Sequence, residues 1–284
     1  MITLYAYAKI NLTLEVLGRR SDGYHEVITV LQTINLKDNL TFESQQGIDI
    51  ECDNPELRSP QNLAVKAARL LQEASGCRKG ALIRLSKGIP EAAGLGGGSS
   101  DAAATLQALN RLWQLGLTRE QLLPLAARLG SDVLFFLYGG TALGTGRGEI
   151  ITPLPPIRPS WLVLFKPPVA VPNDKTRRLY GNLSPSCFSG GVFSRGLTDL
   201  LKRQSTIASS SLFNVFEEVA SKAFPGLEAH WRRFRELGAP NVHLAGSGPT
   251  LFSLVENEAE GKRLCHSLKR EGLEVYLVET VPGS

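Results

Sequence analysis

Residues 90–103 read PEAAGLGGGSSDAA, and this stretch carries the strongest structural signal in the chain. Gly94 and the triplet Gly96 to Gly98 put four glycines in five positions, which permits positive φ angles and close approach of a ligand. Helical spacing of apolar residues begins directly afterwards, at Ala102, Leu106, Leu109 and Trp113. A helix N-terminus offers unpaired N–H groups and the positive end of a dipole. The stretch therefore predicts a loop that binds phosphate.

The residues that this loop lacks exclude two common types of phosphate-binding loop. A Walker A loop needs a lysine before its Ser or Thr, and no lysine stands before Ser99. A dinucleotide fingerprint needs a third small residue, and Gly94-x-Gly96-x-x-Ser99 lacks the third glycine. A flexible linker is the remaining alternative, although linkers do not normally stand directly before an amphipathic helix. Ser99 and Ser100 are expected either to cap the helix or to reach a phosphate-bound Mg²⁺.

The segments before the loop read mainly as strands. Residues 2–17 alternate with period two, which predicts a half-buried strand with Lys9 and Asn11 on the same face. A turn-rich loop follows at residues 18–25. Further elements are expected as strands at 27–36, 40–51 and 81–85 and as a helix at 62–73.

The segments after the loop mix helices and strands. Thr118 and Gln121 form a capping-box start for a helix that Gly130 can end, and Pro124 should kink that helix or delay its start. The Gly- and Pro-rich residues 144–159 mark a boundary between domains 1–155 and 156–284. In the second domain we expect strands at 161–165 and 274–278 and a strand-turn-strand at 242–255. Helices are expected near 212–224 and at 258–271, and loops at 182–191 and 205–211. This order favours an α+β fold over a doubly wound sheet.

Composition narrows the class of protein. The 284 residues carry a net charge of +4 and are 43% hydrophobic, as in an ordinary soluble globular protein, and the charge is too small to argue for nucleic-acid binding. The four cysteines form no C-x-x-C pair, so we expect mostly buried, reduced thiols and no structural metal. The longest nearly apolar run, 133–144, is shorter than the ~18 residues of a membrane span. The expected location is the cytoplasm, or an organelle stroma if a transit peptide has been removed.

Five segments resemble the GHMP family of small-molecule kinases. They are AYAKINLTLEVLGRRSDGYHE (6–26), PQNLAVKAARLL (60–71), GLGGGSSDAAATLQALNRLW (94–113), GSDVLFFLYGGTALGTGRGE (130–149) and LAGSGPTLF (244–252). The first and fourth are similar to one branch of the family in particular. The resemblance implies a two-domain GHMP-kinase fold, with an N-terminal nucleotide-binding domain and a C-terminal ferredoxin-like α/β-sandwich domain.

The resemblance also implies a reaction. In that branch the γ-phosphate of ATP passes to the C2 hydroxyl of a cytidine-diphosphate-linked methylerythritol, in the non-mevalonate route to isoprenoids. ATP enters with Mg²⁺ as a substrate complex, with no tightly bound cofactor and no assigned metal ligand. The implied partners are these small molecules, not nucleic acid or membrane, and the chain would be a monomer or weak dimer. The implied ATP-binding residues are Pro90, Ala93, Gly94, Leu95, Gly96, Gly97, Gly98, Ser99, Ser100, Lys87 and Asn62.

Two residues match the catalytic pair of that branch. Lys9 and Asp132 would hold the phosphoryl group and act on the acceptor hydroxyl. Taken alone, Lys9 is more typical of a surface lysine at a strand end and Asp132 of a helix N-cap, and only the surrounding motif match favours the catalytic roles. Asn62 and Lys87 align with positions near the adenine, and their alternatives are a residue at a helix N-terminus and a solvated charge.

The resemblance places the acceptor near other residues. Asn11 would touch acceptor or phosphate, and Tyr24 with His25 would recognise cytidine by stacking and hydrogen bonding. Thr176 would lie near the acceptor phosphates. Lys175, Arg177 and Arg178 beside it either meet a diphosphate or form a solvated face.

The chain departs from the family pattern at three places. Leu134 stands where a proline is common, which should alter only the local turn. Residues 245–249 read AGSGP, so Gly246-Ser247-Gly248 is either the family's third motif or a plain hairpin turn. Residues 214–217 read NVFE without the usual acidic second residue, and we expect a structural helix there.

Three other functions remain open alternatives. Another GHMP kinase, of the homoserine or phosphomevalonate type, would lack the DGYH loop of residues 22–25. A nucleotide-binding protein without catalysis should have lost Lys9, Asp132 or the loop. An NAD-dependent oxidoreductase should carry an acidic residue at ribose-binding distance after the loop.

Overall fold

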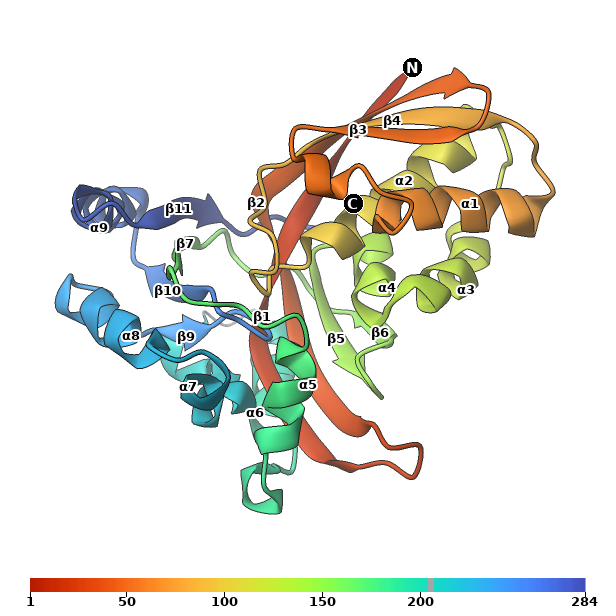
Figure 1. Cartoon of the computed structure of the whole chain (residues 1–284). Helices are drawn as coiled ribbons and strands as arrows, with labels where there is room; N and C mark the ends of the chain where they lie inside the picture. The colour runs from red at the N-terminus through yellow and green to blue at the C-terminus, as the bar shows by residue number, and fades with distance from the viewer. Residues whose placement is uncertain (204–206, 284) are drawn as a thin grey trace. The chain divides into compact units, whose positions relative to one another are not determined.

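Two long strands open the chain in the computed structural model, which describes residues 1–203 and 207–283 (Figure 1). Strand β1 (Ile2–Arg19) is followed after a short turn by β2 (His25–Gln45). The predicted strand at 2–17 is confirmed, but its half-buried character is wrong from Ala8 to Val16, where both faces are buried. The polar face is covered because Thr13 and Glu15 hydrogen-bond to Ser194 and its neighbours instead of to water.

The second long strand corrects another prediction. The expected strands 27–36 and 40–51 are instead one continuous β2 followed by β3 (Ile48–Cys52). The polar triplet Lys37-Asp38-Asn39 suggested a break, yet it lies inside β2. Asp38 is fully buried there because Lys87 supplies an opposite charge.

The chain divides into two compact units that are interleaved in sequence. The first unit holds Met1–Ala8, Leu36–Glu91 and Gly96–Gly139, and the second holds Lys9–Asn35, Ala92–Leu95 and the chain from Gly140 onward. Strands β1 and β2 therefore contribute residues to both units. The expected domain division at residue 155 stays a prediction.

The first unit packs four helices beside a small sheet. Strand β4 (Gly80–Ser86) pairs antiparallel with the end of β2 and parallel with β3. Helices α1 (Leu63–Ser75), α2 (Gly97–Leu112), α3 (Arg119–Leu129) and α4 (Ser131–Tyr138) pack against one another, as Figure 1 shows. A 3₁₀ turn, η1 (Pro55–Leu57), precedes them.

Local signals in the sequence set the ends of these helices. Thr118 and Gln121 form the predicted capping box of α3, and Gly130 ends it. Pro124 lies inside α3 without delaying its start, so that part of the prediction is wrong: five helical residues precede it, and the helix begins at its cap. Leu134 lies within α4 and is buried.

The second unit contains the remaining strands. Strands β5 (Thr141–Thr145) and β6 (Ile150–Pro153) form a hairpin against β2, and β8 (Phe213–Asn214) pairs parallel with β1. A separate antiparallel sheet has the order β11-β7-β10-β9. Its strands are β11 (Glu274–Glu279), β7 (Trp161–Lys166), β10 (Leu251–Val255) and β9 (His243–Leu244). The predicted strands at 161–165 and 274–278, and the strand-turn-strand at 242–255, are confirmed.

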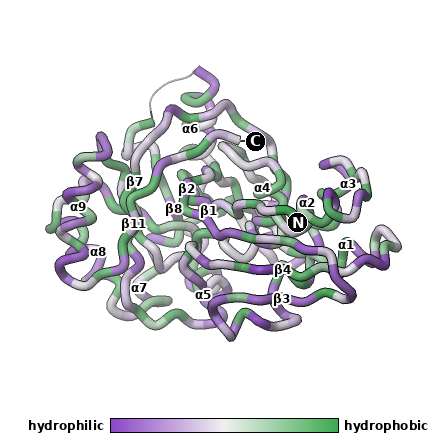
Figure 2. The backbone as a smooth tube through the Cα atoms, turned by 90° about the horizontal axis from the view of Figure 1, so that it is seen from above, coloured by the Kyte–Doolittle hydropathy of each residue, from purple (hydrophilic) through white to green (hydrophobic). Residues whose placement is uncertain are grey.

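The helices of the second unit are α5 (Lys175–Asn182), α6 (Val192–Lys202), α7 (Ala220–Ala223), α8 (Leu227–Glu236) and α9 (Glu258–Arg270). Short 3₁₀ turns lie at η2 (Pro185–Cys187), η3 (Ser209–Ser211) and η4 (Val215–Glu218). Hydrophobic and hydrophilic positions alternate along α8 and α9 in Figure 2, as expected for helices with one buried face. The expected helix at 258–271 is confirmed. The expected loop at 205–211 lies partly outside the described residues.

The helix expected near 212–224 is wrong. This segment holds β8, η4 and the four-residue α7 instead. Asn214 explains the difference: its side chain accepts from the N–H of Phe216 and donates to two carbonyls of another segment. An asparagine committed to such bonds favours a strand end and a turn over a helix interior.

The core of the second unit is aromatic. Phe165 and Phe234 pack edge to face with ring centroids 5.6 Å apart, and Phe216 and Phe224 are buried in the same cluster. Each such side chain contributes about 1.5–3 kcal/mol by leaving water. Within the described residues no helix has the length and apolar character needed to cross a bilayer.

Candidate active site

The glycine-serine loop leads directly into α2. Gly96 is the N-cap residue, with φ +76°, and the helix begins at Gly97. Ser99 and Ser100 lie inside the first turn, and no side chain caps the helix, so the predicted capping by serine is wrong. The first N–H groups of a helix lack intrahelical acceptors. With glycines at Gly97 and Gly98, this end of α2 has the features of an anion site.

The start of the loop packs against the C-terminal glycine turn within the second unit. A Cβ atom on Gly94 would lie 2.2 Å from the carbonyl oxygen of Ala245. The N–H of Thr250 donates to the carbonyl of Ala93 at 3.3 Å. Gly246 and Gly248 have φ of +54° and +60°, which L side chains rarely adopt. The segment is a turn between β9 and β10, and it also packs on the loop, so it is more than a plain hairpin.

Lys9 belongs to a buried polar chain across β1 and β2. Its ammonium donates to Asn11 Oδ1 at 2.7 Å, and Asn11 Nδ2 donates to Thr29 Oγ1 at 2.8 Å. Thr29 donates in turn to the carbonyl of Thr13. Lys9 and Asn11 are each only 5% exposed. The prediction that they share a face is confirmed, and a surface lysine at a strand end is wrong.

Asp132 lies in the first turn of α4, where a carboxylate interacts favourably with the helix dipole. Gly130 is the N-cap residue of α4, so the alternative that Asp132 caps this helix is wrong. Asp132 belongs to the first unit and Lys9 to the second. Their joint action in catalysis stays a prediction.

A buried ion cluster supports the first turn of α2. Lys87 Nζ donates to Asp38 Oδ2 at 2.5 Å and to Asp101 Oδ2 at 3.0 Å. A solvated Lys87 is therefore wrong. A Cβ on Gly97 would lie 3.2 Å from Lys87 Nζ, which places the ammonium beside the start of the helix. Asp38 Oδ1 also accepts from the N–H groups of Gly88 and Ile89.

The two carboxylates of this cluster share one ammonium. Burial raises the pKa of Asp101, the ammonium of Lys87 opposes that shift, and the charge of Asp38 adds to it. Sequence reasoning missed both aspartates. The available signal was an acidic residue inside an apolar pattern, since Asp38 interrupts a strand and Asp101 precedes an alanine run.

Asn62 caps α1 with its side chain. Its Oδ1 accepts from the N–H of Ala64 at 2.9 Å, and its Nδ2 donates to the carbonyl of Leu57 at 3.0 Å. The alternative of a residue at a helix N-terminus is confirmed. Its expected place near the adenine stays a prediction.

His25 of the DGYH loop packs on an aromatic residue that sequence reasoning missed. Its ring stacks on Tyr180 with centroids 4.8 Å apart and planes 17° apart, and Phe188 approaches edge-on. His25 Nε2 is buried with no hydrogen-bond partner among the described residues. Burial, and to a smaller extent the charge of Arg19, lowers the pKa of His25. This shift favours the neutral imidazole, which leaves a buried ring nitrogen without a hydrogen-bond partner among the described residues.

Tyr24 behaves differently from its neighbour. It is 56% exposed, and the guanidinium of Arg147 lies 4.7 Å from its ring centroid. Arg147 was not singled out in the sequence. A cation over an aromatic face stabilises its orientation by about 0.5–1 kcal/mol at an exposed site.

The basic cluster of α5 separates into two kinds of residue. Thr176, Arg177 and Arg178 are exposed, and Arg178 pairs with Asp174 at 2.7 Å, as on a solvated face. Lys175 instead points inward and donates to the carbonyls of Ala92 and Gly248. The alternative of a solvated face is thus wrong for Lys175 alone.

Asn214 and Glu217 hold the glycine turn in place. Asn214 Nδ2 donates to the carbonyls of Leu244 and Gly246, both at 2.8 Å. Glu217 Oε1 accepts from the N–H of Leu244 at 3.0 Å. The asparagine and glutamate of NVFE therefore have a positioning role that needs no acidic second residue.

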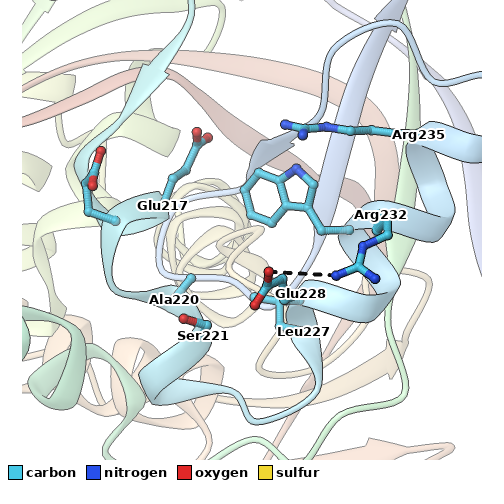
Figure 3. Close-up of a pocket in the computed structure, with 9 residues that line it drawn as sticks. Glu217, Ala220, Ser221, Leu227, Glu228, Arg232 and Arg235 are labelled. Carbon is cyan, nitrogen blue, oxygen red and sulfur yellow. Dashed lines mark ion pairs between the residues drawn. The ribbon is translucent and has the colours of Figure 1, made fainter.

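A pocket of about 460 Å³ opens between α7 and α8 (Figure 3). Glu217, Trp231 and Arg235 line it, and Glu228 pairs with Arg232 across 3.9 Å. None of the residues expected to bind substrate lines this pocket. Within the described chain, no group of three or more His, Cys, Asp or Glu residues is arranged to hold a metal ion.

Comparison with known proteins identifies the family. The GHMP kinases N terminal domain model matches residues 62–140, and the GHMP kinases C terminal model matches residues 194–274. A 4-diphosphocytidyl-2-C-methyl-D-erythritol kinase from Dehalococcoides mccartyi is 44% identical, with 99% of each chain covered. The kinase of the same name from Geobacillus kaustophilus is also 44% identical, over 98% of this chain and 96% of the relative.

Solved structures agree with the sequence relatives. A crystal structure of 4-(cytidine 5'-diphospho)-2C-methyl-D-erythritol kinase matches with a TM-score of 0.84 and 36% identity, and each chain is fully covered. A mevalonate kinase from L. major, solved with R-mevalonate, matches over 99% of this chain and 96% of that chain with a TM-score of 0.73 at 17% identity, which shows a shared fold alone. The expected α+β GHMP-kinase fold and the expected kinase activity are confirmed. The chain belongs to the GHMP kinase family and is similar along nearly its whole length to 4-diphosphocytidyl-2-C-methyl-D-erythritol kinases.

Proposed function

We propose that the protein transfers the γ-phosphoryl group of ATP to the C2 hydroxyl of 4-diphosphocytidyl-2-C-methyl-D-erythritol, in the non-mevalonate route to isoprenoid precursors. The observation that carries this proposal is 44% identity along nearly the whole chain to kinases named for that substrate. The stacked rings of His25 and Tyr180 provide an aromatic surface at the DGYH loop, where the proposal places the cytosine of the acceptor.

The donor half of the proposed site is the first turn of α2. Backbone N–H groups at Gly97 and Gly98 bind phosphate oxygens, and the ammonium of Lys87 lies beside this turn. Mg²⁺ enters as part of the ATP complex and neutralises charge on the phosphates. Through its ion pairs with Asp38 and Asp101, Lys87 links this end of the helix to β2.

The reacting groups of the proposal are Lys9 and Asp132. Phosphoryl transfer depends mostly on positioning and on stabilising charge. The chain from Lys9 through Asn11 to Thr29 fixes the ammonium in one direction, so little reorganisation is needed when charge develops on the phosphoryl oxygens. Asp132 accepts the proton of the acceptor hydroxyl, or holds that hydroxyl by charge.

One assay tests the reaction. The protein is incubated with Mg-ATP and, in parallel, with the cytidylylated acceptor, mevalonate, phosphomevalonate and homoserine. The proposal expects phosphorylation of the cytidylylated acceptor in strong preference to the other three. Preferred phosphorylation of any of those three would refute it.

A variant tests the role of Asp132. Asp132→Ala should retain ATP binding and lose about 10²–10⁴-fold in kcat, the usual contribution of a general base. ATP binding by calorimetry separates this loss from misfolding. Turnover near that of the wild-type protein would remove Asp132 from the reaction.

The proposal also covers the cellular location and the oligomeric state of the enzyme. We infer a cytoplasmic enzyme that acts on small molecules as a monomer or weak dimer. Sedimentation velocity over a tenfold range of protein concentration tests the oligomeric state, and a stable dimer at low micromolar concentration would contradict it.

A further inference from the structure

Lys175 is a partly buried lysine whose hydrogen bonds go to backbone carbonyls. Its ammonium donates to the carbonyl of Ala92 at 2.7 Å and to the carbonyl of Gly248. Ala92 stands at the start of the glycine-serine loop, and Gly248 belongs to the C-terminal glycine turn. Lys175 therefore ties together two backbone segments of the second unit that already pack against each other.

The two carbonyls lie in unusual backbone. Ala92 has φ +52°, one of two non-glycine residues with positive φ in the described chain, and Gly248 has φ +60°. A left-handed alanine costs about 1–2 kcal/mol and persists only where its surroundings hold it. The hydrogen bond from Lys175 is one contact that holds it.

The charge of Lys175 has no carboxylate counterpart among the described residues. Charged groups near it include Lys9, of the same sign, on β1, and the Asp174–Arg178 pair on its own helix. Burial, and then the charge of Lys9, lowers the pKa of Lys175 to about 8. A partly buried ammonium with no paired carboxylate of its own is favoured to bind an anion.

The ammonium of Lys175 also has an N–H donor that neither carbonyl accepts. An ammonium has three N–H donors, and the two carbonyls take one each. The third donor is available to a ligand oxygen. Uncompensated charge and a remaining donor together match a phosphate, which brings negative charge and several acceptor oxygens.

We propose that Lys175 binds a phosphate oxygen of a substrate with its third N–H group, while its other two hold the loop at Ala92 and the turn at Gly248. This inference rests on the proposed function, because it assumes that phosphorylated nucleotides are the ligands. The phosphate belongs either to ATP or to the diphosphate of the acceptor. Thr176, expected near the acceptor phosphates, is the next residue along α5.

The test is equilibrium binding by calorimetry with two probes. Magnesium with a non-hydrolysable ATP analogue reports on the donor, and CDP reports on the acceptor diphosphate. The proteins are the wild type, Lys175→Met, Lys175→Arg and the control Lys222→Met, which alters an exposed lysine of α7 in the same unit. Binding is measured from pH 7 to pH 9.5.

The expected result has two parts. At pH 7, Lys175→Met should weaken one probe by about ten- to a hundredfold, which corresponds to the 1.5–3 kcal/mol of a charge-assisted hydrogen bond. For the same probe, the affinity of the wild type should fall above pH 8 as Lys175 loses its proton. Lys175→Met should be weak at every pH, Lys175→Arg should not lose affinity above pH 8, and Lys222→Met should follow the wild type.

Two outcomes would overturn the inference. One is wild-type affinity of Lys175→Met for both probes at pH 7. The other is weaker binding of Lys175→Met with no fall in wild-type affinity above pH 8, which is the result expected from a purely structural tether. If Lys175→Met does not fold, the pH profiles of wild type and Lys175→Arg decide. Failure of the wild type to phosphorylate the cytidylylated acceptor would refute the proposed function and leave these binding results intact.

Discussion

Alanine substitution at two glycines of one loop should have opposite effects on stability. Gly94 has φ +85°, and a Cβ there would lie 2.2 Å from Ala245 O and 2.8 Å from Gly248 N. Left-handed backbone costs an alanine about 1–2 kcal/mol, and displacing packed atoms costs about 1–3 kcal/mol more. Gly94→Ala should therefore lower the free energy of unfolding by about 2–5 kcal/mol, out of a total of about 5–15 kcal/mol for a typical protein.

Gly98 provides the matched control four residues later. It lies in the first turn of α2, and a Cβ there would meet only Leu63 Cδ1, at an ordinary 3.5 Å. Alanine in a helix is favoured over glycine by about 0.5–1 kcal/mol, so Gly98→Ala should be as stable as the wild type or more stable. Its added methyl group stands at the proposed phosphate site, and we expect the KM for ATP to rise about tenfold.

Urea unfolding followed by circular dichroism measures the first effect, and steady-state kinetics with varied ATP measures the second. Gly94→Ala should lower the midpoint urea concentration without changing the slope. A midpoint equal to that of the wild type would refute the argument from backbone contact. Loss of more than about 1 kcal/mol in Gly98→Ala would refute the argument that a Cβ there makes only an ordinary contact with Leu63.

Three further substitutions test the buried polar groups. Burial raises the pKa of Asp101, so the folded protein keeps a proton on this carboxyl that the unfolded chain releases above about pH 3.9. The free energy of unfolding of the wild type should therefore fall as the pH rises from about 3.9 through neutrality. Asp101→Asn should flatten that dependence in urea melts at pH 5 to 8, and an unchanged slope would contradict the shift. Asn214→Ala leaves two carbonyls without their donor and should lower the free energy of unfolding by about 2–4 kcal/mol. A loss below about 1 kcal/mol would mean that other contacts hold the glycine turn. Glu15→Gln replaces a carboxylate that accepts from Ser194 N–H and Ser189 O–H, and it should lower the free energy of unfolding by about 1–2 kcal/mol in the same melts. A variant as stable as the wild type would show that the charge of Glu15 is not needed.

Local sequence signals predicted much of the secondary structure. The capping box at Thr118, the alternation of β1 and the glycines before α2 each act over a few residues, so the sequence reveals them directly. Predictions failed where a distant partner overrides the local pattern. The polar residue Asp38 lies within a continuous strand because Lys87, 49 positions away, neutralises it.

The sequence by itself determined the glycine loop that leads into α2 and, through its resemblance, the family, whereas phosphate binding and the roles of the site residues stay predictions. Backbone freedom at glycine and the free N–H groups of a helix start are properties of a short segment, and so they can be predicted from it. Only the tertiary structure decided that Asp38 and Asp101 share one ammonium, that His25 stacks on Tyr180, and that Lys175 points inward while Arg178 faces solvent. Charge pairing, stacking and burial depend on which distant residues meet, and that is decided when the chain packs.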